Sequence, residues 1–117
     1  MINTDRVYIE HRNVGYPEPT YGYAPSQKYP EYAWDDISTE KNEVYDMVRN
    51  CLKGYGLDAQ NFGTAEWNPL GDIISEGDSV VIKPNWVEDK NQNWNGGMEC
   101  LVTHASVIRV VMDYVSL

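Results

Sequence analysis

Residues 13–36 contain prolines too often for a regular helix or a paired strand. The stretch includes Pro17, Pro19, Pro25 and Pro30. Proline fixes φ, lacks a backbone N–H donor and interrupts the hydrogen bonding of both helices and sheets. The pattern predicts a long extended loop. Its aromatic side chains either attach the loop to the domain surface or line a ligand pocket; they are Tyr16, Tyr21, Tyr23, Tyr29, Tyr32 and Trp34.

Two other segments have the apolar periodicity of amphipathic helices. The first lies at about residues 40–54, with Ser38 or Thr39 as its cap and with glycines 54 and 56 as its stop. The second lies at about residues 104–116, with Thr103 as its cap. Apolar residues recur at spacings of three and four in both: Val44, Met47, Val48, Cys51, Leu52 and Tyr55, then Val107, Ile108, Val111, Met112 and Val115. The pair Asn68-Pro69 resembles a helix start and predicts a third, short helix at about residues 69–74.

Two segments have the composition of β-strands. Residues 6–11 alternate and are rich in β-branched and aromatic side chains. Residues 79–83 form a continuous β-branched run, typical of a central strand that is covered on both faces, and Pro84 ends it. Residues 88–97 are polar and predict a loop, with a hairpin turn at Asn95-Gly96 as the alternative.

The order of these elements predicts an α/β fold, with a partial open sheet and flanking helices. Two strands make a poor sheet, so residues 1–117 are interpreted as a single incomplete α/β domain. The length alone suits one domain of ordinary size.

Charge excludes one class of partner. The chain has 9 Lys and Arg against 18 Asp and Glu, for a net charge of −9. Phosphate backbones attract clustered basic side chains, so we expect no nucleic-acid partner. The beginning of the chain has no basic leader with an apolar core, and no apolar run approaches the roughly 20 residues of a membrane span, so we expect a cytoplasmic protein without a membrane partner. Cys51 and Cys100 are expected to be buried thiols, and no metal site is expected at Cys100 and His104, because one such pair is too few ligands.

The residues that best suit chemistry flank the predicted strand end and the last helix start. Ligands of open α/β sheets bind beyond the carboxyl ends of strands, where helix amino termini also gather. Lys83 would supply a positive charge and His104 a proton-transfer group, since a helix amino terminus lowers the pKa of an imidazole. We interpret these two residues as candidate catalytic groups, and Asn85, Trp86 and Thr103 as candidate ligand-binding groups. The alternative is structural: Thr103 only caps the helix while Lys83 and His104 face solvent.

The same two segments resemble a known family. Residues 78–85, DSVVIKPN, followed by residues 101–109, LVTHASVIR, are similar to the amino-terminal part of proteins in the family called domain of unknown function 362. The upstream residues GLD at 56–58 and WNPL at 67–70 resemble one subgroup, so the similarity covers about residues 40–117. The resemblance implies a partial member of a longer domain without an established activity. Family members usually have proline where this chain has Ala105, and the iron–sulfur cysteines of some members have no counterpart here.

Two functions follow as hypotheses. In the first, an enzyme-like protein handles a small anionic or sugar-like metabolite at Lys83, Asn85, Thr103 and His104. In the second, a noncatalytic binding or interaction domain uses the aromatic-rich loop and Trp34 or Trp94. The residues identify neither a cofactor, a substrate nor an oligomeric state.

Overall fold

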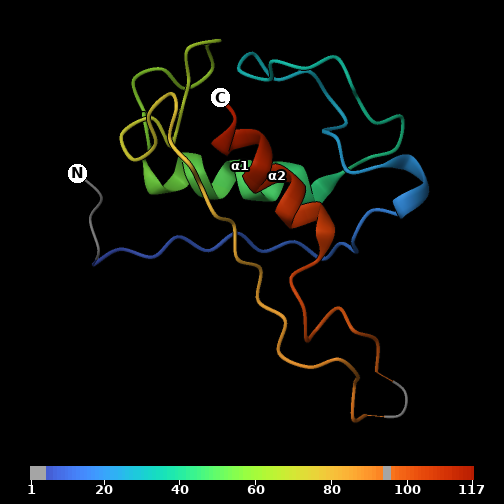
Figure 1. Ribbon diagram of the computed structural model, residues 1–117. Coiled ribbons are helices and arrows are strands. Elements are labelled where there is room, and N and C mark those ends of the chain that lie inside the picture. Colours follow the sequence, from blue (N-terminus) through green and yellow to red (C-terminus); the bar gives the residue numbers. More distant parts are fainter. Residues whose placement is uncertain (1–4, 94–95) are drawn as a thin grey trace.

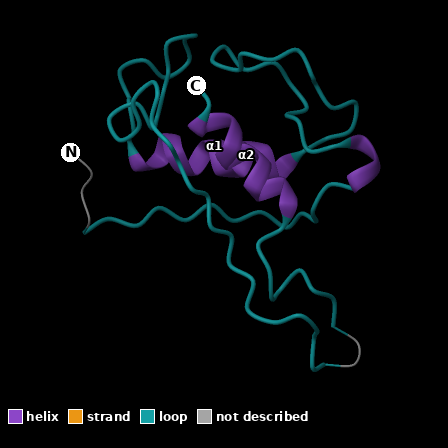
Figure 2. Ribbon diagram, in the orientation of Figure 1, coloured by secondary structure: helices purple, strands orange, loops and turns teal. Residues whose placement is uncertain are grey.

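The chain folds mostly as loops and turns around two α-helices (Figure 1). The computed structural model describes residues 5–93 and 96–117. Along these residues the elements are a 3-10 helix η1 (Pro19–Tyr21), α1 (Glu43–Tyr55) and α2 (Ala105–Val115). Figure 2 shows no strand in this part of the chain. The prediction of an α/β fold with a partial open sheet is therefore wrong.

Helix α1 confirms the helix predicted at residues 40–54. The Asn42 side chain accepts a hydrogen bond from the backbone N–H of Tyr45, so Asn42 is the cap rather than Ser38 or Thr39. Gly56 ends the helix in the left-handed conformation, at φ 91°. An L-amino acid with a side chain rarely adopts that conformation, which explains why glycine occupies this position.

Helix α2 confirms the second predicted helix and packs on α1 through aromatic rings and apolar side chains. The buried residues of α2 are Ser106, Val110, Asp113 and Tyr114, and Tyr114 lies 6.4 Å from Tyr45 of α1 between ring centroids. Met112, a member of the apolar stripe that predicted the helix, is exposed instead. The cap of α2 is His104, whose side chain accepts from Ser106 N–H, and not Thr103 as predicted.

The short helix predicted at residues 69–74 is replaced by consecutive turns. Gly71 N–H donates to Asn68 and Ile73 N–H to Leu70, which are the three-residue bonds of turns. Glycine in a helix interior costs about 1 kcal/mol relative to alanine, and Gly71 lies in the middle of this segment. The prediction was wrong because it used only the Asn68-Pro69 start signal.

Neither predicted strand forms. Residues 6–11 and 79–83 make no main-chain to main-chain hydrogen bond within the described ranges. The Val81 side chain is 90% exposed and the Val7 side chain 85% exposed. β-branched composition favours an extended backbone, but a strand also needs a neighbour for its N–H and C=O groups, and neither segment has one here.

The proline-rich loop lacks regular structure apart from η1, as predicted, but it contributes more to the core than predicted. Tyr29 and Tyr32 are buried in an aromatic cluster with Tyr45, Trp67, Val110 and Tyr114. Trp67 packs edge-on against Tyr114 with 5.5 Å between ring centroids. Tyr29 and Tyr32 are therefore core residues, whereas Tyr16 and Tyr21 of the same loop are exposed.

A buried ion pair fixes the loop to α1. Glu31 of the loop accepts two hydrogen bonds from the Arg49 guanidinium, at 2.6 and 3.1 Å. Only 2% of the Glu31 side chain and 10% of the Arg49 side chain are exposed. The guanidinium also lies 4.2 Å from the Tyr29 ring centroid and 5.1 Å from that of Trp67. Charge pairing and cation–π contacts thus meet on one side chain.

A second network connects the loop to α2. Arg109 donates to Asp113 on its own helix and to Tyr32 and Asp36 of the loop. Asp113 also accepts a hydrogen bond from Tyr45 at 2.9 Å. The hydrogen bonds from Tyr32 and Arg109 lower the pKa of the Asp36 carboxyl. These bonds hold loop, α1 and α2 together.

Part of the chain projects from this core. The radius of gyration is 15.4 Å, whereas a compact domain of this length has about 13 Å. Figure 1 shows the reason: the orange segment leaves the helices, extends away from them and returns to α2. In the described residues no helix combines the length and the apolar character that crossing a bilayer requires.

The buried ion pair predicts a large effect of a single substitution. Arg49→Ala should lower the free energy of unfolding by about 3–5 kcal/mol, because it leaves the Glu31 carboxylate buried without its partner. Urea denaturation followed by circular dichroism measures this. Lys28→Ala removes an ion pair to Asp35, a hydrogen bond to the Trp34 carbonyl and a cation–π contact with Tyr32, all made by a half-exposed side chain, and it should cost much less than Arg49→Ala. Equal effects of the two variants would contradict the prediction.

Candidate functional site

The two segments that carry the predicted site residues are in direct contact. Asn85 N–H donates to the Thr103 hydroxyl at 3.1 Å, and Thr103 N–H donates to the Asn85 carbonyl at 2.9 Å. Val87 N–H donates to the Leu101 carbonyl at 3.2 Å. Between them, Trp86 and Val102 form an isolated antiparallel bridge. The structure therefore brings Asn85, Trp86 and Thr103 together, as predicted, but through a short antiparallel contact and not at a sheet edge.

This contact resembles the base of a hairpin, which was the alternative for residues 88–97. Residues 88–93 and 96–97 are irregular and include bends. Asn91 closes part of this loop by donating to the Gly97 carbonyl at 2.7 Å. Asn95 and Trp94, which the hairpin and the interaction hypotheses used, lie outside the described residues.

His104 has a structural role at the start of α2. Its Nδ1 accepts the Ser106 backbone N–H at 3.2 Å and lies 2.8 Å from the Ser106 hydroxyl. In this arrangement Nδ1 is the atom of the ring that caps the helix. The ring also stacks on Tyr16, with 4.1 Å between centroids, and meets the edge of Tyr23 at 5.6 Å. These contacts hold the ring in place without any ligand.

Ser106 is fully buried, with 0% of its surface exposed. Ser106 and His104 therefore have the residue types of a nucleophile and its base but cannot act as such, because a substrate cannot reach the hydroxyl. The pair is best described as a capping motif.

Lys83 and Trp86 face solvent. The Trp86 side chain is 71% exposed, and Lys83 is exposed as well. Because the predicted strand is absent, Lys83 does not end at a sheet edge beside the helix start. Within residues 5–93 and 96–117, no group of three or more His, Cys, Asp or Glu is placed to hold a metal ion.

The cysteines differ from each other. Both are free thiols; Cys51 is half-buried, whereas Cys100 is exposed. The expectation of a buried thiol is thus wrong for Cys100, which lies in the projecting loop. Cys51 lines a cavity of about 270 Å³ together with Tyr16, Val14 and Met47. Of the two alternatives for the aromatic residues of the loop, Tyr16 thus fits the one in which they line a pocket.

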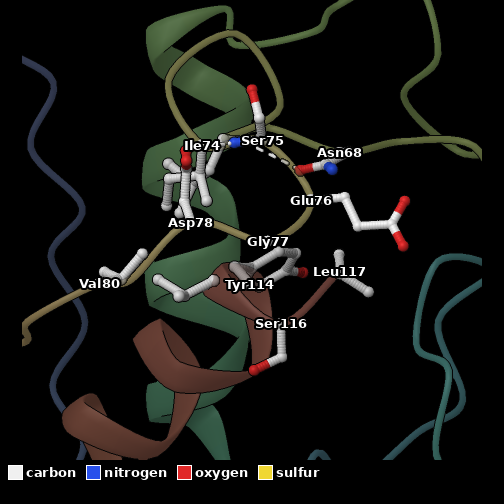
Figure 3. A pocket seen from close by; sticks show the side chains of 12 residues that line it. Asn68, Ile74, Ser75, Glu76, Gly77, Asp78, Val80, Tyr114, Ser116 and Leu117 are labelled. Carbon is white, nitrogen blue, oxygen red and sulfur yellow. Dashed lines mark hydrogen bonds between the residues drawn. The ribbon is translucent and has the colours of Figure 1, made fainter.

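A larger cavity of about 720 Å³ lies between the turns that follow Asn68 and the end of α2 (Figure 3). Its apolar walls come from Leu70, Ile74, Val80 and Val115. Acidic and polar groups complete it: Asn68, Ser75, Glu76, Asp78, Tyr114 and Ser116. A volume of this size is in the usual range for ligand pockets, roughly 300–1,000 Å³.

The turn that shapes this cavity was recognised in the sequence only as a chain reversal. Gly77 adopts φ 90°, which glycine permits, and Asp78 accepts a hydrogen bond from Ser75 N–H at 2.8 Å. The side chain of Glu76 points away from Gly77 (Figure 3), and Glu76 is exposed. No periodicity or motif in the sequence could have placed α2 opposite this turn.

The cavity lies where the exposed β-branched segment begins. Asp78 and Val80 line it, and residues 79–83 continue from there toward the projecting loop. The two features that sequence reasoning did not connect, an open cavity and an unpaired extended segment, are therefore adjacent.

No family model, no curated protein and no solved structure matches the chain. The resemblance to the domain of unknown function 362 family stays a prediction.

The role of His104 can be tested by comparing two substitutions. His104→Ala should destabilise the protein by about 1 kcal/mol, because it removes the cap of α2 and the stacking on Tyr16. His104→Asn should restore most of the loss, since asparagine caps helices well. Urea denaturation measures both variants. If His104→Asn were as destabilising as His104→Ala, the capping role would be refuted.

Proposed function

We propose that this chain is a noncatalytic interaction domain that binds an extended peptide along residues 79–83. The binding mode is strand addition, in which a partner peptide pairs with exposed backbone groups. This is the interaction class predicted from the sequence, with a different surface. Part of the aromatic-rich loop is used for the core: Tyr29 and Tyr32 are buried there, and Trp34 packs on Tyr32 at 5.3 Å between centroids.

The observation that carries the proposal is the state of residues 79–83. They are β-branched, extended and without main-chain partners in the described parts of the chain. Val80 and Val81 are both exposed. An exposed apolar segment with unpaired N–H and C=O groups is a template for another strand. A bound peptide would pair these groups and cover the valines.

The ends of the segment are held in place. On one side, Asp78 N–H donates to the Ser75 carbonyl at 3.0 Å. On the other, Asn85 is bonded to Thr103. A peptide would therefore meet a backbone whose ends are fixed, which lowers the entropic cost of binding.

A selection experiment tests the proposal. From a display library of random ten-residue peptides, the wild-type chain should enrich extended, β-branched sequences. The double variant Val80→Pro/Val81→Pro removes one N–H donor from each hydrogen-bonding edge of the segment. It should enrich none of these peptides. The matched variant Val80→Thr/Val81→Thr keeps both donors and should behave as the wild type.

Hydrogen exchange provides the direct measurement. Amides of residues 79–83 should exchange with little protection in the free chain, and at least about tenfold more slowly with a selected peptide bound. Because the proline variant loses no main-chain bond of the free chain, its helical circular dichroism should be unchanged. Enrichment of the same peptides by wild type and proline variant would refute strand addition.

A second candidate function is binding of a small anion near Lys83, Asn85, Thr103 and His104. The observation in its favour is the pair of hydrogen bonds between Asn85 and Thr103, which fixes the two segments relative to each other. Lys83 comes two residues before this contact, and the start of α2 follows it. The partial positive charge of a helix start favours an anion. This candidate is the function that goes with the resemblance to the domain of unknown function 362 family. It would place the protein in the cytoplasm.

Thermal unfolding with phosphate or acetate tests this second candidate. At a hundredfold excess over Kd, a bound anion adds about 2.7 kcal/mol and raises Tm by several degrees. Lys83→Ala should abolish the rise, whereas Lys90→Ala, which removes an exposed lysine of the projecting loop, should preserve it. An unchanged Tm of the wild-type chain with both anions would refute this function.

A further inference from the structure

The cavity beside the start of the exposed segment adds a chemical requirement to the proposed partner. A peptide paired with residues 79–83 passes Val80, which belongs to both the segment and the cavity wall. In strand addition the main chain provides affinity, and pockets for side chains provide specificity. The cavity is therefore placed to receive one side chain of such a peptide.

The lining of the cavity favours a long side chain with a cationic end. Leu70, Ile74 and Val115 offer apolar walls, and Glu76 and Asp78 offer carboxylates. Lys and Arg place an apolar stem against apolar surface and keep the charged head in a polar environment. A carboxylate paired with such a head forms a charge-assisted hydrogen bond, stronger than a neutral one.

No cationic side chain of the described residues already occupies that role. The residues that line the cavity include no Lys, Arg or His. The Asp78 carboxylate accepts a hydrogen bond from Ser75 N–H, and Glu76 is exposed. The chain as a whole has a net charge of −9, which attracts a basic partner and repels a second copy of the chain.

We propose that the cavity of about 720 Å³ binds a lysine or arginine side chain of an extended partner peptide that pairs with residues 79–83. The inference rests on the proposed function, since it takes the peptide backbone to be held by the segment. It adds that the partner is a basic, β-branched peptide from another protein.

The composition of the selected peptides tests the two proposals separately. Peptides that are β-branched and carry a recurrent Lys or Arg, enriched by the wild type and lost with Val80→Pro/Val81→Pro, are the expected result. β-branched peptides without a recurrent basic residue would overturn the cavity assignment and leave the interaction function standing. If no enrichment depended on the backbone of residues 80 and 81, both proposals would be refuted.

Titration calorimetry with a selected ten-residue peptide locates the basic side chain. Glu76→Gln keeps the shape of the side chain and removes its charge, and it should weaken binding about tenfold. Glu66→Gln changes an exposed carboxylate outside the cavity and should leave the affinity unchanged.

The same peptide with methionine in place of its basic residue completes the test. It should bind about tenfold more weakly to the wild type and equally well to wild type and Glu76→Gln. A loss of the same size in Glu66→Gln as in Glu76→Gln would show a general charge effect, and it would overturn the cavity assignment.

Discussion

The ion pair between Glu31 and Arg49 is the interaction on which the rest of the fold depends. A loop with four prolines cannot hold itself in place through regular backbone hydrogen bonds. Its position comes from side chains, and Arg49 provides several contacts at once: two hydrogen bonds to Glu31 and cation–π contacts to aromatic rings. Tyr114 of α2 donates to the same Glu31 carboxylate at 2.8 Å, so one buried acid connects the loop to both helices. Burial raises the pKa of the Tyr114 hydroxyl, with the Glu31 carboxylate as the next cause. The hydroxyl thus stays a donor to the carboxylate.

The helices could be predicted from the sequence, because the signals for them are local. The apolar stripe of α1 and the stop at Gly56 lie within one segment, and both were confirmed. A strand is different, since it exists only when a second segment supplies hydrogen bonds. Residues 79–83 have the composition of a buried strand. Composition shows that the segment favours pairing with another strand, but it does not show whether the described chain contains that strand. The burial of Tyr29 and Tyr32 also could not be predicted, because their partners Arg49, which lies over the Tyr29 ring, and Arg109, which donates to Tyr32, are distant in sequence.

In the candidate site, too, some features could be predicted from the sequence and others could not. The expectation that Asn85 and Thr103 lie together is met, although the reason given for it, a shared sheet edge, is wrong. The two residues meet because the chain between them returns on itself and makes a brief antiparallel contact. His104 was selected for its residue type, and the structure uses its Nδ1 as a cap and its ring as a stacking partner for Tyr16. The cavity beside Glu76 escaped prediction, since it forms between turns and a helix end that are more than thirty residues apart in sequence.

The residues around the exposed segment limit what can pair with it. Pro84 has no N–H donor, so an added strand can bond only to its carbonyl, and the usable edge is close to residues 79–83. Such a segment would also promote aggregation if copies of the chain paired with one another. A net charge of −9 opposes that approach, and in a parallel arrangement in register Asp78 would meet Asp78 of the second copy. A basic peptide is attracted by this net negative charge. The same acidic groups that discourage self-association therefore favour a cationic partner. The unpaired edge can thus select its partner by charge although it is exposed.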